Sequence, residues 1–328
     1  MSMQSRFGRF SLKTLAVLVG ICLTQAALAW TDKPVKLLVP APAGGTMDVI
    51  ARMLADQLLA DTGQPMIVDN RPGAGGAIAV QALRAAPADG QTVMVTASNV
   101  LTEIPHVMKT GFDPLKDVRP VGFIARGSLV MIAAPNVAAK DFKGFMAYAK
   151  KNPGNLSFAS YSTGTISHYV GMILNQKAGL DLQHVPFLGS PPALAQVMGG
   201  QIPVMFDGFA TSRALIAGGK VQAYAVASKA RLPQLPDVPT FAELGYPELN
   251  FSNWLGVVVS GALSPELSEK IHKAVKAVAM NPKFKERMLA NGFDAAEDAN
   301  MVQMSQTVKL DFDRNAAIVK QFNIQLNQ

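Results

Sequence analysis

Apolar and polar residues alternate in blocks that predict short β-strands separated by amphipathic helices. An apolar run at 35–39 ends at a segment rich in proline and glycine, and a helix with apolar residues at helical spacing follows, from Thr46 or Met47 to Leu59. Further strands are expected at 65–68, 92–96, 121–125, 129–133, 185–187, 204–206, 223–227 and 255–259, and further helices at 77–86, 142–150, 166–178, 265–279 and 301–321. This alternation predicts an α/β protein with a parallel sheet that is covered by helices.

The succession of strands and helices occurs twice, which predicts two α/β lobes. A chain of this length exceeds the usual size of a single hydrophobic core. We expect residues 30–126 to form the first part of lobe 1, residues 127–252 to form lobe 2, and residues 253–328 to return to lobe 1. The chain is expected to cross between the lobes near 123–126 and again near 251–256.

Residues 1–29 have the features of a cleaved export signal. The segment begins with three basic residues, Arg6, Arg9 and Lys13. An apolar run at 14–24 follows, and 27–29 has the small-x-small form that signal peptidases recognise. The apolar run is too short to be a stable membrane anchor. We therefore expect an exported protein that begins at Trp30.

Cys22 is the only cysteine of the chain, and it lies inside the predicted signal. It follows Ile21 instead of a small residue, which argues against a lipid-anchored form. Without this segment the chain has no cysteine, so disulfides, thiolate metal sites and a cysteine nucleophile are excluded. A chain without free thiols also suits an oxidising compartment.

The charge distribution argues against a nucleic-acid-binding protein. The formal net charge of +7 includes the three basic signal residues, and only 16% of all residues are charged. The remaining lysines and arginines are scattered and form no long basic run. A mild positive balance favours anionic ligands, although only weakly.

Two glycine turns, at 42–48 and 162–168, each join the end of a strand to the start of a helix. A helix start offers unpaired N–H groups and the positive end of the helix dipole, which together bind anions. In the first turn Gly44 and Gly45 allow a ligand to approach the backbone closely. In the second turn hydroxyl groups accompany the glycine, and His168 is expected to brace the loop or to touch a ligand. Taken alone, the first turn is better explained by simple helix capping, whereas the second is explained about equally well by capping and by ligand binding. Their pairing across two lobes favours a ligand cleft.

Four other positions are candidates for the cleft wall or its support. The turn at 70–76 lacks the Lys-Ser/Thr ending of a P-loop and the third glycine of a dinucleotide site, so we expect it to support the cleft. Asp207 and the pair Ser98-Asn99 each follow a strand, where a side chain either faces ligand or caps a helix. Trp254 is expected either in the cleft wall or in the core.

An exported hydrolase that uses Ser162 or Ser167 with His168 is the enzymatic alternative. The chain has no Gly-x-Ser-x-Gly elbow, and two adjacent helical residues point to different faces. The other three histidines, His106, His184 and His272, are each isolated in the sequence, so a metal site lacks ligands. We therefore expect no catalysis, no metal and no cofactor.

The combination of motifs resembles the Bug/TctC family, the periplasmic receptors of tripartite tricarboxylate transporters. The resemblance covers essentially all of the chain after the signal. It is carried by Ala43-Gly44-Gly45, Asp69-Asn70-Arg71-Pro72-Gly73-Ala74-Gly75-Gly76, Gly164-Thr165, His184-Val185-Pro186-Phe187, Gly199-Gly200-Gln201, Phe206-Asp207 and Leu235-Pro236-Asp237-Val238-Pro239-Thr240.

The resemblance implies a type II periplasmic binding protein fold that holds a small organic carboxylate between the two glycine turns, partly through water. It implies an inner-membrane permease as partner, a periplasmic location and a monomeric receptor. A ligand sensor that feeds a signalling system stays an alternative. Including the residues inferred above, the expected ligand-binding residues are Ala43, Gly44, Gly45, Thr46, Asp48, Ser98, Asn99, Ser162, Thr163, Gly164, Thr165, His168 and Asp207.

One position departs from the family pattern. Where the family usually has an aromatic residue after the proline of the first strand end, this chain has Ala41. A small side chain beside the ligand site leaves space. We therefore expect a ligand bulkier than a simple amino acid, such as an aromatic carboxylate or a dicarboxylate such as a phthalate isomer.

Overall fold

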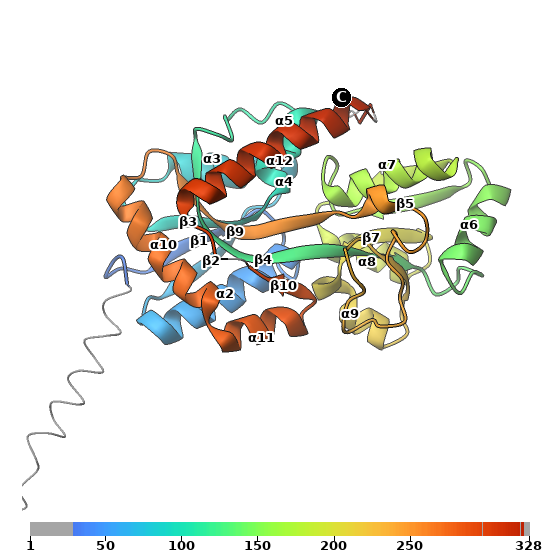
Figure 1. The fold of residues 1–328 in the computed structure, drawn as a ribbon, viewed down its shortest axis with the longest axis horizontal. Coiled ribbons are helices and arrows are strands. Elements are labelled where there is room, and N and C mark those ends of the chain that lie inside the picture. Colours follow the sequence, from blue (N-terminus) through green and yellow to red (C-terminus); the bar gives the residue numbers. More distant parts are fainter. Residues whose placement is uncertain (1–28, 297, 322, 325–328) are drawn as a thin grey trace, which may run out of the picture.

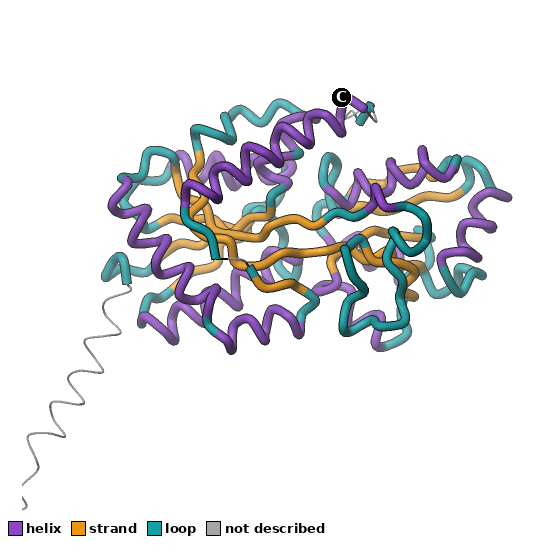
Figure 2. Tube along the Cα trace, in the orientation of Figure 1, coloured by secondary structure: helices purple, strands orange, loops and turns teal. Residues whose placement is uncertain are grey.

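A ten-stranded sheet runs through the length of the molecule, with helices on both of its faces (Figures 1 and 2). The structure is a computed structural model that describes residues 29–296, 298–321 and 323–324. The strands follow the order β2-β1-β3-β9-β4-β7-β5-β6, and β8 and β10 both pair with β4. The predicted export signal lies outside the described residues, except for its last position. Within the described residues, no helix has the length and apolar character needed to cross a bilayer.

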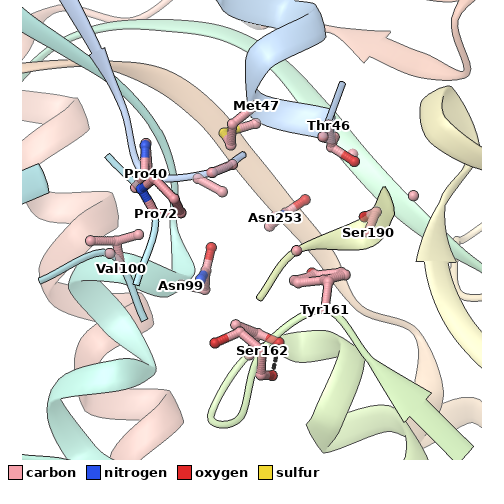
Figure 3. A pocket seen from close by; sticks show the side chains of 18 of the residues that line it. Pro40, Thr46, Met47, Pro72, Asn99, Val100, Tyr161, Ser162, Ser190 and Asn253 are labelled. Atoms are coloured by element: carbon pink, nitrogen blue, oxygen red, sulfur yellow. Dashed lines mark hydrogen bonds between the residues drawn. The ribbon is translucent and has the colours of Figure 1, made fainter. Parts of the chain in front are cut away.

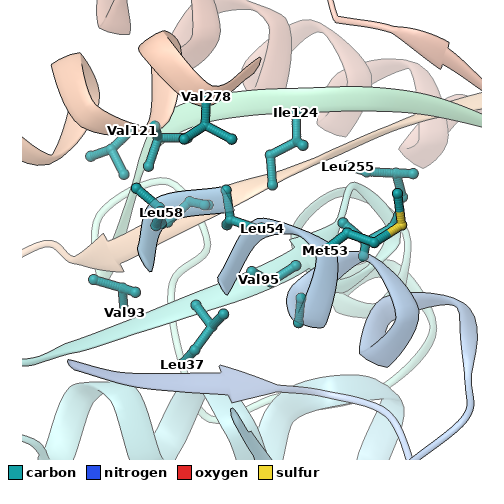
Figure 4. Close-up of a cluster of buried hydrophobic side chains, with 14 of the residues drawn as sticks. Leu37, Met53, Leu54, Leu58, Val93, Val95, Val121, Ile124, Leu255 and Val278 are labelled. Atoms are coloured by element: carbon teal, nitrogen blue, oxygen red, sulfur yellow. The ribbon is translucent and has the colours of Figure 1, made fainter. Parts of the chain in front are cut away.

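The first group of strands contains β1 (Val35–Val39), β2 (Met66–Asn70) and β3 (Thr92–Ala97), which are parallel, with β1 in the middle. Helices α2 (Thr46–Thr62) and α3 (Ala77–Ala85) pack on these strands, and α10 (Pro265–Met280) and α11 (Pro282–Ala290) extend the helical cover over β4 and β10. Figure 4 shows the core between them, where Leu37, Leu54 and Val95 are completely or almost completely buried. Each such side chain contributes roughly 1.5–3 kcal/mol of transfer free energy.

The second group repeats this arrangement. It contains β5 (Leu156–Ser160), β6 (Leu182–Pro186), β7 (Val204–Gly208) and β8 (Gln222–Val226), with β5 parallel to both β6 and β7. Its helices are α6 (Phe142–Lys151), α7 (Ile166–Ala178), α8 (Ser190–Met198) and α9 (Phe209–Ala217). The unit β1–α2–β2 thus has a counterpart in β5–α7–β6, although the two sequences show no repeat.

Two long strands connect the groups. Strand β4 (Val118–Ala133) is continuous over 16 residues, whereas the apolar pattern predicted two strands at 121–125 and 129–133. Its first part pairs with β9 (Ser252–Ser260) and its second part pairs with β7 and β8. These pairings are antiparallel, so the expected parallel arrangement holds within each group but the sheet as a whole is mixed. Residues 126–128, which separate the two apolar runs, stay in the strand because each of them pairs with a residue of β9.

The last helix packs across both strand groups. Helix α12 (Met301–Gln321) lies on α4 (Asn99–Thr102), α5 (Ile104–Val107) and β4. The amide of Asn315 donates to the hydroxyl of Thr102 at 3.2 Å, which fixes the helix on the first group. Farther along, Ile318, Val319 and Ile324 pack against the core of the second group.

Several short elements were not predicted by the hydrophobic pattern. They are α4, α5, α11, β10 (Phe293–Ala295) and two 3-10 turns at Ala74–Gly76 and Pro247–Leu249. Helix α11 begins at a proline, and the Asn281 side chain accepts hydrogen bonds from the backbone N–H groups of Lys283 and Phe284. This local capping fixes the start of α11.

Candidate ligand-binding site

A cavity lies where the ends of strands from both groups meet beside β4 and β9 (Figure 3). Its polar side chains are Thr46, Asn99, Ser128, Tyr161, Ser162, Thr165, Ser190 and Asn253. Its apolar side chains are Pro40, Ala41, Pro42, Met47, Pro72, Ala97, Val100, Leu129, Leu188, Leu255 and Phe293. No charged side chain belongs to the lining among the described residues. A ligand in this cavity therefore meets neutral hydrogen-bonding groups on an apolar background.

The first glycine turn is held in shape by a carboxylate at the start of α2. Gly44 has φ of +78°, a left-handed conformation that glycine adopts without a steric penalty. Its N–H donates to Oδ2 of Asp48 at 2.9 Å. The same carboxylate also accepts from Arg52 at 3.0 Å and from Asn70 at 3.1 Å. Asp48 is almost completely buried and lies behind the loop, outside the cavity lining.

These donors keep Asp48 ionised. Burial raises its pKa, but the hydrogen bonds from Arg52, Gly44 and Asn70 together outweigh burial, so the pKa lies below its usual value. The sequence placed Asp48 among the ligand-binding residues. The structure places it as the brace of the turn that reaches the cavity.

The second glycine turn has the same construction, with a histidine in place of the carboxylate. Gly164 has φ of +73°, and its N–H donates to Nδ1 of His168 at 3.2 Å. The hydroxyl of Thr165 donates to the carbonyl of Ser162 at 2.7 Å, which closes the loop. In both turns, the residue four positions after the glycine accepts the glycine N–H.

His168 is part of a buried stack of two imidazoles. Its ring centroid lies 3.9 Å from that of His184, and Nε2 of His184 is 2.7 Å from the hydroxyl oxygen of Ser160. Burial lowers the pKa of His168 to about 4, and burial together with His168 lowers the pKa of His184 to about 3. His168 is therefore neutral at neutral pH. Because its Nδ1 accepts a hydrogen bond, its proton resides on Nε2.

Asp207 is completely buried beneath the cavity wall. Its Oδ1 accepts from the hydroxyl of Ser190 and its Oδ2 from that of Thr211, both at 2.6 Å. Burial raises its pKa to about 6, against the lowering effect of these hydrogen bonds. Ser190, and not Asp207, belongs to the lining. With its proton directed to Asp207, the Ser190 hydroxyl presents an acceptor to the cavity.

Five of the thirteen expected ligand-binding residues line the cavity, and the other eight do not belong to its lining. The lining contains Gly45, Thr46, Asn99, Ser162 and Thr165. Ala43, Gly44, Asp48, Ser98, Thr163, Gly164, His168 and Asp207 are not part of it. Ser98 is buried, and its carbonyl accepts from the backbone and side chain of Thr102. The ligand contacts of these residues stay predictions.

Sequence reasoning missed the contribution of the two connecting strands. Ser128 of β4 and Asn253 of β9 lie on paired strands, where Asn253 is opposite Gly127, and both residues reach the cavity. Nothing in their local sequence distinguishes them from ordinary polar strand residues. The turn at 70–76 was expected only to support the cleft, yet Pro72, Gly73 and Gly75 line the cavity directly. Its Arg71 pairs with Asp69 at 2.9 Å.

Trp254 belongs to the core rather than to the cavity wall. Only 1% of its surface is exposed, and its ring stacks on Phe123 with a centroid distance of 5.0 Å. The core alternative of the sequence analysis thus holds. His272 is buried, and its Nδ1 lies 2.9 Å from the carbonyl oxygen of Val121.

The geometry gives no support to a serine hydrolase. The hydroxyl of Ser167 donates to the carbonyl of Phe206 at 2.5 Å, so it is directed away from His168. The contact between Ser160 and His184 has the right atoms, but Ser160 is fully buried and outside the cavity lining. Within the described residues, no cluster of three His, Cys, Asp or Glu side chains is suited to hold a metal ion.

A mixed sheet of two strand groups with a neutral cavity between them defines a solute-binding receptor. The chain belongs to the tripartite tricarboxylate transporter family receptors (TctC), whose family model matches residues 50–324. This assignment confirms the resemblance that the glycine turns and the later motifs indicated. The family consists of receptors rather than enzymes, in agreement with the expectation that the chain performs no catalysis.

Known relatives cover nearly all of the chain. A "UPF0065 protein in tcbD-tcbE intergenic region" from Pseudomonas sp. (strain P51) is 30% identical over 95% of each chain. The solved periplasmic binding protein BugD is 30% identical and superposes with a TM-score of 0.85, covering 90% of this chain and 100% of BugD. The R. palustris protein Rpa4515, solved with adipate, is 26% identical with a TM-score of 0.86, covering 91% of this chain and all of Rpa4515. The expected fold of a periplasmic binding protein is thereby confirmed.

Proposed function

We propose that this chain is a periplasmic receptor that closes around a small organic carboxylate and presents it to the permease of a tripartite tricarboxylate transporter. The observation that carries the proposal is the cavity between the two braced glycine turns, lined by neutral polar groups from both strand groups. Neutral hydroxyl and amide groups bind a carboxylate strongly when water is excluded. The adipate seen in the R. palustris relative belongs to this class of ligand.

Lobe closure follows from the division into residues 30–126 with 253–328, and 127–252. Each lobe contributes one braced turn, so a bridging ligand makes both sets of contacts only in the closed form. Binding then shifts the equilibrium toward closure. The crossings in β4 and β9 are the positions where the backbone bends, and the permease recognises the closed shape. The predicted signal at 1–29 delivers the chain to the periplasm. There the chain acts as a monomer.

The finer proposal is an aromatic carboxylate, such as benzoate or a phthalate isomer. Ala41 lies in the lining and leaves space beside the first turn. Pro40, Pro72 and Val100 form an apolar wall near it (Figure 3). An apolar wall opposite neutral donors suits a flat ring that carries a carboxylate.

A thermal-shift screen tests both parts. The purified chain is heated with benzoate, the three phthalates, adipate, aspartate and glutamate, since a ligand that binds only the native state raises Tm. The largest rise is expected with an aromatic acid. A rise with aspartate or glutamate and none with aromatic acids would remove the aromatic proposal. No rise with any carboxylate would remove the receptor proposal itself.

A further inference from the structure

Glu103 is a buried carboxylic acid that the proposed ligand cavity does not use. It lies between α4 and α5 on the first strand group, and only 3% of its surface is exposed. Its Oε2 has no hydrogen-bond partner within the described part of the chain. Burying a carboxylate without sufficient partners is costly, so such a group either becomes protonated or has a role that offsets the cost.

The surroundings of Glu103 belong largely to the other strand group. The hydroxyl of Tyr169 on α7 donates to the carbonyl oxygen of Glu103 at 3.3 Å. The backbone N–H of Ile166, at the start of α7, interacts with the Glu103 carboxyl. The neighbouring side chain of Val107 lies directly against Gly164, where an added Cβ would collide with it. Glu103 therefore contacts the helix that follows the second glycine turn.

The charged and titratable groups around Glu103 come from three elements. Arg314 and Asp311 face it from α12, and they pair with each other at 3.0 Å. Tyr161 and Tyr169 face it from the second group. Burial is the main cause that raises the pKa of both phenols, and the negative charge of Glu103 raises it further. The phenols are therefore neutral, and Arg314 is the one positive charge among these four groups.

We infer that Glu103 is a positioning residue for ligand capture, which holds α7 and its glycine turn against the first lobe and makes lobe closure depend on pH. The inference rests on the proposed function, because it assumes that the two lobes open and close. In the closed form the carboxyl is enclosed between α4, α7 and α12. Opening the lobes separates α7 from Glu103 and returns the carboxyl to water.

The direction of the pH effect follows from proton linkage. In the closed form burial raises the pKa of Glu103 to about 8, with Arg314 and the Ile166 N–H lowering it and Asp311 raising it. In water the pKa returns toward its ordinary value of 4.5. The closed form thus binds a proton that the open form releases. Between these two values, the ratio of closed to open molecules rises as the pH falls, by up to about tenfold per pH unit.

The test measures lobe closure without any ligand. Residues 30–328 contain no cysteine, so nitroxide labels can be attached at Gln81→Cys on α3 and Lys220→Cys after α9, both exposed positions. Electron–electron distance measurements between pH 6 and pH 8.5 should show the closed distance gaining population as the pH falls. In the Glu103→Gln chain the distribution of label-to-label distances should not change with pH. The closed distance should still be populated at pH 8.5, because glutamine stays neutral. Glu286→Gln, at an exposed position on α11, is the matched control and should behave as the unmodified chain.

Two outcomes would overturn the inference. One is a distance distribution of the unmodified chain that does not change with pH, a measurement that needs no folded variant. The other is a Glu103→Gln chain that titrates in parallel with the unmodified one. Failure of the proposed function is recognised separately, because it would appear as a lack of carboxylate binding in the thermal screen while the ligand-free distances are unaffected.

Discussion

At the scale of single residues, the candidate site depends on side chains that are small or neutral. Ala41 leaves space in the cavity wall, and the Thr165 hydroxyl fixes the loop of the second turn through Ser162. Neither residue is charged, and neither forms part of a hydrophobic helix face. Their effect comes from where the backbone places them, so substitutions should change affinity more than stability.

Replacing Ala41 with phenylalanine should reduce affinity for aromatic acids. The added ring fills the space that we assign to the ligand, and overpacking of this kind costs about 1–3 kcal/mol. Calorimetry with benzoate and with adipate measures the effect, which should be larger for benzoate. Ala60→Phe, at an exposed position of α2, is the control. Equal affinities of the Ala41→Phe and unmodified chains for benzoate would contradict the aromatic proposal.

Replacing Thr165 with alanine should weaken carboxylate binding by about 0.5–1.5 kcal/mol, the usual net contribution of one hydrogen bond between neutral groups, because the second turn is then no longer fixed. The variant loses the bond to the Ser162 carbonyl, which lies at 2.7 Å. Thr165→Ser keeps the hydroxyl and should retain most of the affinity. Titration calorimetry distinguishes the two variants. An unchanged affinity of Thr165→Ala would argue that the ligand lies elsewhere.

At the scale of elements, the two glycine turns are alike in geometry but differ in chemistry. Each follows the end of a strand, has a glycine with positive φ, and is braced by the residue four positions later. Asp48 is an ionised brace with three donors, whereas His168 is a neutral brace stacked on His184. The two turns should therefore respond differently to acid.

His168 should make the fold less stable as the pH falls from 6.5 toward 4. In the native state its pKa is lowered to about 4, so the unfolded chain takes up a proton at His168 that the native chain does not. Relative to His168→Asn, the free energy of unfolding should fall by up to about 1.4 kcal/mol per pH unit in this window. Comparing the two chains isolates His168 from Glu103 and Asp207, whose raised pKa values act in the opposite direction.

Urea denaturation at several pH values measures this difference. Above about pH 7.5 the difference in unfolding free energy between the two chains should be constant, because His168 is then neutral in both the native and the unfolded state. Parallel curves over the whole range from pH 7 to pH 4 would show that His168 titrates normally in the native state.

At the scale of the whole molecule, the two strand groups are joined by more than the two crossing strands. β4 and β9 pair along the crossing, and α12 packs on the first group while its last residues contact the core of the second. In the proposed mechanism, these connections restrict the lobes to a hinge motion, and ligand and Glu103 act on the same equilibrium between open and closed forms.

Ligand binding should make the molecule more compact. Small-angle X-ray scattering with and without the acid that is most effective in the thermal screen should show a smaller radius of gyration in the bound state. The expected direction follows because the bridging ligand contacts both turns only when the lobes are closed. An unchanged radius despite a raised Tm would mean that the solute binds to one lobe alone.

The sequence predicted those features that depend on local pattern. The strands at 35–39 and 92–96 and the helices at 166–178 and 301–321 agree with the structure to within one residue at each end. The glycine turns were also recognised, because a glycine run between an apolar strand and an amphipathic helix is a local signal. Family membership followed from the same motifs.

Only the tertiary structure decided which side chains face the cavity. Asp48, His168 and Asp207 have the chemistry of ligand-binding residues, yet they fold back onto their own loops or onto Ser190, because burial requires partners for their polar atoms. Ser128 and Asn253 reach the cavity because β4 and β9 pair across a long stretch of sequence. The continuity of β4 likewise depends on the partners β9 and β7. The hydrophobic periodicity of a segment indicates which of its faces is buried. It does not identify the segment that packs against this face, because that segment lies far away in the chain.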